Sequence, residues 1–230
     1  MKKYQYLLFD ADETLFDFRK AEQEAFHLTC DKSSIPFSEG IYRVYSDIND
    51  GLWKLLEKGG TTLTELKLER YRRLLETLRF PEETIHEKAA EMRDLYTDFL
   101  GQQAFLLDGA AEVCRKLSEN YTLYIITNGI SRIQRARLEK TPLRPFIKDI
   151  FISEEIGAAK PAKEYFDKVL NAVGSPDRSD YLVIGDSLTS DIRGAVQYGL
   201  DSCWYNPKGL TTELPVTYTV SRLRELYDFL

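Results

Sequence analysis

The chain has 230 residues, of which 31 are Lys or Arg and 37 are Asp or Glu, giving a formal net charge of −6. This balance argues against a nucleic-acid polymer as partner, because a phosphate-binding surface needs an excess of basic groups. With 43% hydrophobic and 12% aromatic residues, the chain has ample material for a buried core and is not expected to be disordered. Its length suits one large domain, or one domain with a smaller insertion.

The cysteines and histidines limit the kinds of metal site. Cys30, Cys114 and Cys203 are widely spaced, which predicts neither a disulfide framework nor a thiolate zinc site. With only two histidines, a divalent metal would be held by oxygens, which favours magnesium or calcium. The apolar stretch that ends at Asp10 is too short for a signal peptide or membrane span, so we expect a cytoplasmic protein with no membrane partner.

The first half of the chain reads as one strand followed by helices. Continuous apolarity over residues 4–9 predicts a strand covered on both faces, as in a parallel sheet. Residues 41–56 carry an apolar stripe at helical spacing, and Gly59-Gly60 ends that helix. Thr62 and Glu65 form a capping box for a helix reaching residue 78, and Pro81 starts another that reaches residue 99.

From residue 108 onward, helices and strands alternate. We expect helices over residues 110–117, around 133–138, over 162–172 and 192–198, and at the C-terminal end. The strands fall at 122–126, 150–152, 181–184, 203–205 and 216–220. This alternation predicts a doubly wound α/β fold with a parallel sheet. We expect residues 1–16 and 105–230 to form the α/β core, with the α-helical segment 17–104 inserted as a cap.

Unusual polar residues directly follow the predicted strands. They are Asp10 and Asp12, then Thr127 and Asn128, then Asp186, with Lys160 in a loop before a helix. Ligands of open parallel sheets bind outside the carboxyl ends of the strands, so these residues should meet at one edge. Carboxylates suit Mg²⁺, while a lysine and backbone amides suit phosphate oxygens. A carboxylate aimed at phosphorus can act as the nucleophile, so the set predicts hydrolysis of phosphate monoesters.

Four motifs in order resemble the haloacid dehalogenase-like phosphatases, over the whole chain. Residues 9–15 (FDADETL) resemble the first motif and Thr127-Asn128 the second. Lys160-Pro161 resembles the third, and residues 185–191 (GDSLTSD) the fourth. The long interval after Asp12 matches the helical cap of that family.

The resemblance implies a role for each residue. Asp10 would be the nucleophile that forms a phosphoaspartyl intermediate, and Asp12 the general acid and then the base. Mg²⁺ would be bound by the carboxylates of Asp10 and Asp186 and the backbone carbonyl of Asp12. Asp191 would lie in the second coordination shell or contact the metal through a water. Thr127 and the Asn128 backbone would grip the phosphate, and Lys160 would neutralise both Asp10 and phosphate.

Softer features indicate a branch of the family. Residues 12–18, 152–157 and 203–206 resemble the house-cleaning pyrimidine 5'-nucleotidases. The expected partner is therefore a small phosphorylated metabolite, with a nucleoside 5'-monophosphate favoured. A small sugar-phosphate or phosphoglycolate phosphatase, a sugar-phosphate mutase and a non-catalytic phosphate-binding module are the alternatives.

Several residues have simpler interpretations. An Asp after a strand is often only a turn or cap residue, and an isolated lysine is usually on the surface. We expect Arg132, Arg135 and Arg137 to form a solvated helix face, with electrostatic steering of phosphate as the alternative. Tyr42, Tyr45 and Trp53 are expected in the core, with stacking on a nucleobase as the alternative. The sequence leaves the oligomeric state open, with a monomer compatible.

Overall fold

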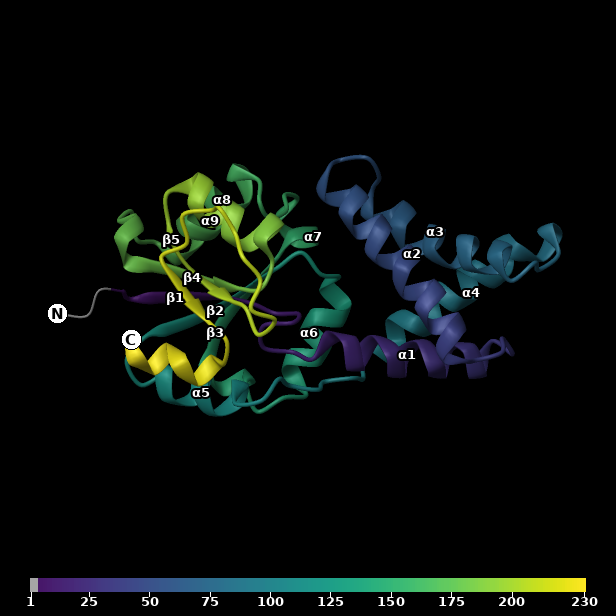
Figure 1. The fold of residues 1–230 in the computed structure, drawn as a ribbon, viewed down its shortest axis with the longest axis horizontal. Coiled ribbons are helices and arrows are strands. Elements are labelled where there is room, and N and C mark those ends of the chain that lie inside the picture. Colours follow the sequence, from purple (N-terminus) through teal and green to yellow (C-terminus); the bar gives the residue numbers. More distant parts are fainter. Residues whose placement is uncertain (1–3) are drawn as a thin grey trace. The chain divides into compact units, whose positions relative to one another are not determined.

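The computed structural model describes residues 4–230 and divides the chain into two compact units. One unit consists of Met1–Phe18 and Ala104–Leu230, and the other of Arg19–Gln103. The first contains the sheet with its flanking helices, and the second is helical (Figure 1). The cysteines are free and buried.

The α/β unit is built on a six-stranded sheet in the order β3-β2-β1-β4-β5-β6. The strands are β1 (Tyr6–Asp10), β2 (Thr122–Thr127), β3 (Ile147–Ile152), β4 (Tyr181–Gly185), β5 (Asp201–Tyr205) and β6 (Tyr218–Val220). Every neighbouring pair is parallel. In register, Phe9 of β1 lies opposite Ile125 of β2 and Ile184 of β4. The predicted parallel α/β sheet is confirmed.

Both faces of the sheet are covered, which explains why β1 is apolar without alternation. Leu7 and Phe9 pack in one layer with α5 (Ala110–Leu117) and the closing 3-10 helix η4 (Leu223–Asp228). Leu8 points into the opposite layer, with α8 (Lys163–Val173) and α9 (Arg193–Tyr198). Because successive strand side chains point to opposite faces, a strand buried on both sides must be apolar at every position.

The remaining elements of this unit are short. They are α6 (Ser131–Glu139), η1 (Arg144–Phe146), α7 (Ser153–Ile156), η2 (Arg178–Asp180) and the π-helical turn η3 (Leu188–Ile192). The sequence had predicted neither α7 nor the π-helical turn, and the closing helix is 3-10 rather than α.

The helical unit contains α1 (Phe18–Lys32, which begins in the α/β unit), α2 (Glu39–Glu57), α3 (Leu63–Thr77) and α4 (Glu82–Leu100). The capping box of Thr62 and Glu65 is confirmed, whereas Pro81 occupies the N-cap position rather than the first turn. Its interior is not purely apolar. Asn49 lies between Glu22 and Arg70, accepting a bond from Arg70 and donating one of 2.7 Å to Glu22. All three side chains are buried.

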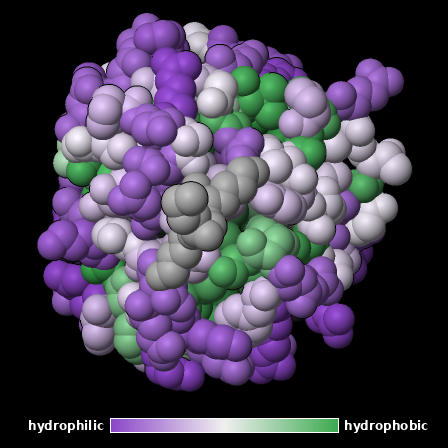
Figure 2. Space-filling view, turned by 90° about the vertical axis from the view of Figure 1, so that its left-hand side faces the viewer, coloured by the Kyte–Doolittle hydropathy of each residue, from purple (hydrophilic) through white to green (hydrophobic). Residues whose placement is uncertain are grey.

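The surface at the end where β1 begins is mixed and largely hydrophilic, with separate apolar patches (Figure 2). The polar strand ends lie at the other end of the sheet. Among residues 4–230, no helix is both long enough and apolar enough to cross a membrane.

Candidate active site

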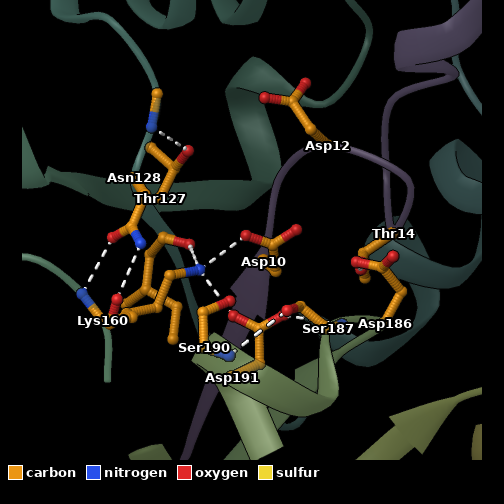
Figure 3. A network of polar contacts seen from close by, with 12 residues as sticks. Asp10, Asp12, Thr14, Thr127, Asn128, Lys160, Asp186, Ser187, Ser190 and Asp191 are labelled. Carbon is orange, nitrogen blue, oxygen red and sulfur yellow. Dashed lines mark hydrogen bonds and ion pairs between the residues drawn. The ribbon is translucent and has the colours of Figure 1, made fainter. Parts of the chain in front are cut away.

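The carboxyl ends of three adjacent strands bring the predicted polar residues together (Figure 3). Asp10 is the last residue of β1, and Thr127 is the last residue of β2. Asp186 directly follows Gly185 at the end of β4. Because β2 and β4 flank β1 in parallel, their ends face the same edge and their side chains converge on Asp10.

Lys160 lies in the loop before α8, and its side chain reaches the carboxyl ends of the strands. Its buried ammonium donates hydrogen bonds of 2.6 Å to Asp10 Oδ1 and to Asp191 Oδ1, and one of 2.8 Å to the Ile126 carbonyl. An ammonium has three protons, so these three contacts use all of them. Lys160 is thus a fixed counter-charge for two carboxylates, and its predicted contact with phosphate would require one of these bonds to be exchanged.

Asn128 fixes the backbone of Lys160. The Asn128 amide nitrogen donates to the Lys160 carbonyl at 2.8 Å, and the Lys160 N–H donates to Asn128 Oδ1 at 2.8 Å. Thr127 is buried, and its hydroxyl oxygen accepts a bond of 3.0 Å from the Gly129 N–H. The Asn128 side chain therefore positions Lys160, a role that the sequence did not predict, whereas the contact of its backbone amide with phosphate stays a prediction.

Asp191 packs against Gly185 at the end of β4. Its Oδ2 accepts a bond of 3.1 Å from the Ser187 N–H, while its Oδ1 receives Lys160. A Cβ on Gly185 would lie 2.3 Å from Asp191 Oδ2, so only glycine admits this carboxylate. Asp191 is fully buried and belongs to the site rather than only capping the helix that follows.

Thr14 and Trp204, which were not predicted as site residues, both donate hydrogen bonds to Asp186. Thr14 donates a hydroxyl bond of 3.5 Å to Asp186 Oδ1. The indole N–H of Trp204, on β5, donates to the Asp186 carbonyl at 2.9 Å. Residues 203–206 resemble the pyrimidine 5'-nucleotidase branch of the family. The contact of Trp204 with Asp186 depends on the pairing of β4 with β5, so the sequence of this stretch alone did not predict it.

The acidic residues form a cluster that could hold a cation. Carboxylate oxygens of Asp10, Asp186 and Asp191 all lie within 4.8 Å of one another. Three carboxylates against one ammonium leave a net charge of −2 when all are ionised. A compact set of oxygens with two excess negative charges fits an oxygen-preferring divalent cation. The Asp12 side chain is not part of this cluster, and the predicted role of its backbone carbonyl stays a prediction.

Burial and crowding raise the pKa values of these carboxyl groups. Burial, followed by the charge of Asp191, raises the pKa of Asp10 well above its ordinary value, against the opposing effect of Lys160. Burial, followed by Asp191 and Glu13, raises the pKa of Asp186 to about 7. Burial lowers the pKa of Lys160, but Asp10 and Asp191 outweigh it and the net shift is upward. The cluster thus favours cations, either protons or a metal.

Asp12 points away from Asp10 and is held by α6 (Figure 3). Arg137 forms an ion pair with Asp12 Oδ1, and Gln134 donates to Asp12 Oδ2 at 2.5 Å. The prediction that Arg137 lies on a solvated face is wrong, since its side chain is fully buried, whereas Arg132 and Arg135 are exposed. The helical spacing that puts Arg137 on the face of the buried residue Ile133 was the signal available in the sequence.

Comparison with known proteins agrees with this geometry. Residues 4–199 match the family of haloacid dehalogenase-like hydrolases. The YfnB protein of Bacillus subtilis strain 168, named as a HAD-hydrolase, is 40% identical, with 100% of this chain and 97% of that protein covered. A crystal structure of YfnB, described as bound to magnesium, superposes with a TM-score of 0.91 at 39% identity, covering 99% of this chain and 98% of that one.

Two further relatives carry a named activity. Pyrimidine 5'-nucleotidase YjjG of Escherichia coli K12 is 34% identical, covering 99% of this chain and 98% of that protein. Pyrimidine 5'-nucleotidase PynA of Streptococcus pneumoniae R6 is 35% identical, covering 99% and 95%. The chain therefore belongs to the haloacid dehalogenase-like hydrolases and is an enzyme of that class.

Proposed function

We propose that this protein is a Mg²⁺-dependent phosphatase that hydrolyses pyrimidine nucleoside 5'-monophosphates through a phosphoaspartyl intermediate. The observation that carries the proposal is the environment of Asp10. Its Oδ1 is held by Lys160 at 2.6 Å, while Oδ2 has no hydrogen-bond partner among the described residues. A fixed carboxylate with one oxygen available is suited to nucleophilic attack on phosphorus.

The reaction proceeds in two displacements at phosphorus. An Asp10 carboxylate oxygen forms a bond to phosphorus while the bond to the nucleoside 5'-oxygen breaks, and that oxygen takes the proton of the Asp12 carboxyl. Water then attacks the phosphoaspartyl phosphorus and gives its proton to the Asp12 carboxylate. The bond from phosphorus to Asp10 breaks, so that nucleoside and inorganic phosphate leave and Asp12 is protonated again.

Asp10, Asp186 and the Asp12 carbonyl would hold Mg²⁺, and Asp191 would orient Lys160 and the loop after β4. When bound, the cation withdraws charge from the phosphoryl oxygens, which is the main demand of phosphoryl transfer. The net charge of −2 that the cluster carries when all three carboxylates are ionised supports this role. Thr127 and the backbone of Asn128 would bind the phosphoryl oxygens.

We propose the helical unit as the cap that contributes selectivity. The chain leaves the α/β unit after Phe18, six residues beyond Asp12, and returns to it at Ala104. Phe16 bridges to Leu106, and the Asp17 N–H donates to the Phe105 carbonyl at 3.1 Å. A cap inserted shortly after the general acid in the sequence would select the leaving group, and the two full-length nucleotidase relatives support a pyrimidine nucleoside as that group.

Release of inorganic phosphate from a panel of about thirty monoesters tests the proposal. The panel contains pyrimidine and purine 5'-monophosphates, sugar phosphates and phosphoglycolate, with Mg²⁺ or with EDTA. We expect the highest kcat/KM for a pyrimidine 5'-monophosphate, no turnover in EDTA and none for Asp10→Asn. A preference for sugar phosphates or phosphoglycolate would contradict the substrate class, and activity of Asp10→Asn would contradict the mechanism.

A further inference from the structure

The contacts of Asp12 extend the site to one face of α6. Arg137 pairs with Asp12 Oδ1 and Gln134 with Oδ2, so each carboxylate oxygen has its own partner. The Asp12 side chain is 26% exposed, whereas that of Arg137 is completely buried. Without these partners, a carboxylate so open to water would be free to change rotamer. With them, its direction is fixed by a buried cation and an amide.

The two partners are themselves fixed. The guanidinium of Arg137 lies over the ring of Phe16, with 4.4 Å between its central carbon and the ring centroid. Gln134 is buried, and its amide passes directly over Gly129, where a Cβ would lie 2.3 Å from Gln134 Nε2. The end of β2 thus needs a glycine to admit the amide that holds Asp12. Arg137 is confined by the Phe16 ring, and the Gln134 amide is packed directly against the backbone of Gly129, so neither side chain can move far.

The direction in which they hold Asp12 has a chemical reason. In-line transfer places the leaving oxygen on the side of phosphorus opposite the Asp10 oxygen. A group that protonates this oxygen has to stand away from Asp10, with the phosphoryl group between them. Figure 3 shows the Asp12 carboxylate turned away from Asp10, toward α6.

We propose that Arg137 and Gln134 are positioning residues for Asp12: they orient its carboxylate toward the leaving oxygen rather than toward Asp10. This inference rests on the proposed function, in which Asp12 exchanges protons with the leaving group and water. Both residues bond to the Asp12 carboxylate itself, so we infer that their effect on catalysis passes through Asp12. A loosened general acid costs on the order of 10²-fold in rate.

A double-mutant cycle tests this route. With uridine 5'-monophosphate, Arg137→Met lowers kcat about 10²-fold with little change in KM, and Asp12→Asn lowers it at least as far. In the Asp12→Asn background, Arg137→Met has no further effect, because the group it orients is absent. If instead Arg137→Met costs as much in that background as in the native protein, Arg137 acts independently of Asp12 and the inference is overturned.

A change of leaving group separates positioning from a general loss of structure. p-Nitrophenolate departs without protonation, so formation of the phosphoenzyme from p-nitrophenyl phosphate does not need Asp12, whereas its hydrolysis does. Arg137→Met should therefore retain a rapid stoichiometric burst of p-nitrophenolate followed by slow turnover. A burst slowed as much as turnover of the nucleotide would indicate damage to the nucleophile and contradict the proposal.

Matched variants keep the test decisive. Arg135→Met removes an exposed arginine of the same helix, whose partner is Glu155, and should leave both substrates unaffected. If Arg137→Met does not fold, Gln134→Leu and Gly129→Ala remove or displace the other contact and should reproduce the burst pattern. Full activity of Asp12→Asn would refute the proposed function, whereas an inactive Asp12→Asn beside a fully active Arg137→Met would refute this inference alone.

Discussion

Asn128 and Lys160 exchange two hydrogen bonds of 2.8 Å between the side-chain amide of one and the backbone of the other. The pair connects the end of β2 to the loop before α8, 32 residues further along the chain. Since the Lys160 ammonium then reaches Asp10 and Asp191, the Asn128 amide sets the distance between a strand end and the charge that balances these two carboxylates.

Asn128→Ala should therefore lower activity by releasing the Lys160 loop. We expect kcat to fall about 10- to 100-fold, the usual cost of losing a supporting hydrogen bond behind a reacting group. Asn128→Asp should be no better, because its second carboxylate oxygen would face the Lys160 carbonyl. Steady-state kinetics with a nucleotide substrate provides the measurement. Asn171→Ala, at an exposed position of α8, is the control, and native kcat in Asn128→Ala would show that the loop holds its place without the amide.

Gly185→Ala should weaken metal binding without changing any ligand. The added Cβ would lie 2.3 Å from Asp191 Oδ2, so Asp191 has to move and Lys160 loses a fixed partner. We expect the Mg²⁺ concentration for half-maximal activity to rise about 10- to 100-fold. Gly51→Ala is the control, because a Cβ there meets nothing within 4 Å and glycine is unfavourable within a helix. An unchanged Mg²⁺ requirement in Gly185→Ala would argue against the role of Asp191.

The raised pKa of Asp186 predicts how the metal-free protein responds to pH. Its pKa is about 7 in the folded protein, against an ordinary value of 3.8, so folding retains a proton that the unfolded chain releases. This contribution to stability is fully present below about pH 4 and is lost as the pH rises through about 7. Under the proposed function, Mg²⁺ would bind the ionised cluster and so restore the lost stability.

Thermal unfolding with EDTA and with Mg²⁺, from about pH 5 to about pH 8, measures this effect. The gain in Tm from Mg²⁺ should increase with pH by several degrees. In Asp186→Asn, whose side chain does not titrate, the gain should be smaller and depend less on pH. A gain that shrinks as the pH rises in the native protein would contradict the account of the cluster.

The helical unit offers a prediction about stability that is independent of the active site. Asn49 joins Glu22 to Arg70, and burial raises the pKa of Glu22. Asn49→Ala leaves a buried carboxylate and a buried guanidinium without their bridge, at a cost of about 2–4 kcal/mol of unfolding free energy. Urea unfolding of this variant against the exposed control Asp47→Ala tests it. Equal stability of the two variants would mean that the polar core rearranges freely.

Local patterns were enough to predict the strand ends and hence the cluster. Asp10, Thr127 and Asp186 each follow an apolar run, and the parallel rule sends such ends to one edge. The sequence did not predict what holds the cluster together. The amide of Asn128 reaches the loop before α8, and the indole of Trp204 reaches from β5 to the residue after β4. These partners depend on register and side-chain direction rather than on local spacing.

The burial of charged side chains was the property that the sequence predicted least well. Arginines on a helix are usually solvated, and for Arg132 and Arg135 that expectation is correct. Arg137 is buried because Asp12 pairs with it and Phe16 covers it, and both partners lie more than a hundred residues away in the chain. Arg70 in α3 is buried in the same way, with its partner Asn49 on another helix. A charge pattern along one helix carries no information about such partners.

Chemical trapping of the intermediate tests the central claim, that Asp10 carries the phosphoryl group. Asp12→Asn mixed with p-nitrophenyl phosphate and Mg²⁺ should accumulate the phosphoenzyme, because formation proceeds and hydrolysis stalls. Borohydride reduction of the quenched protein converts an acyl phosphate to homoserine, which peptide mass spectrometry locates. The account predicts homoserine at position 10 only when substrate and Mg²⁺ are both present. Reduction at position 186 or 191 instead, or none during a measured burst, would contradict it.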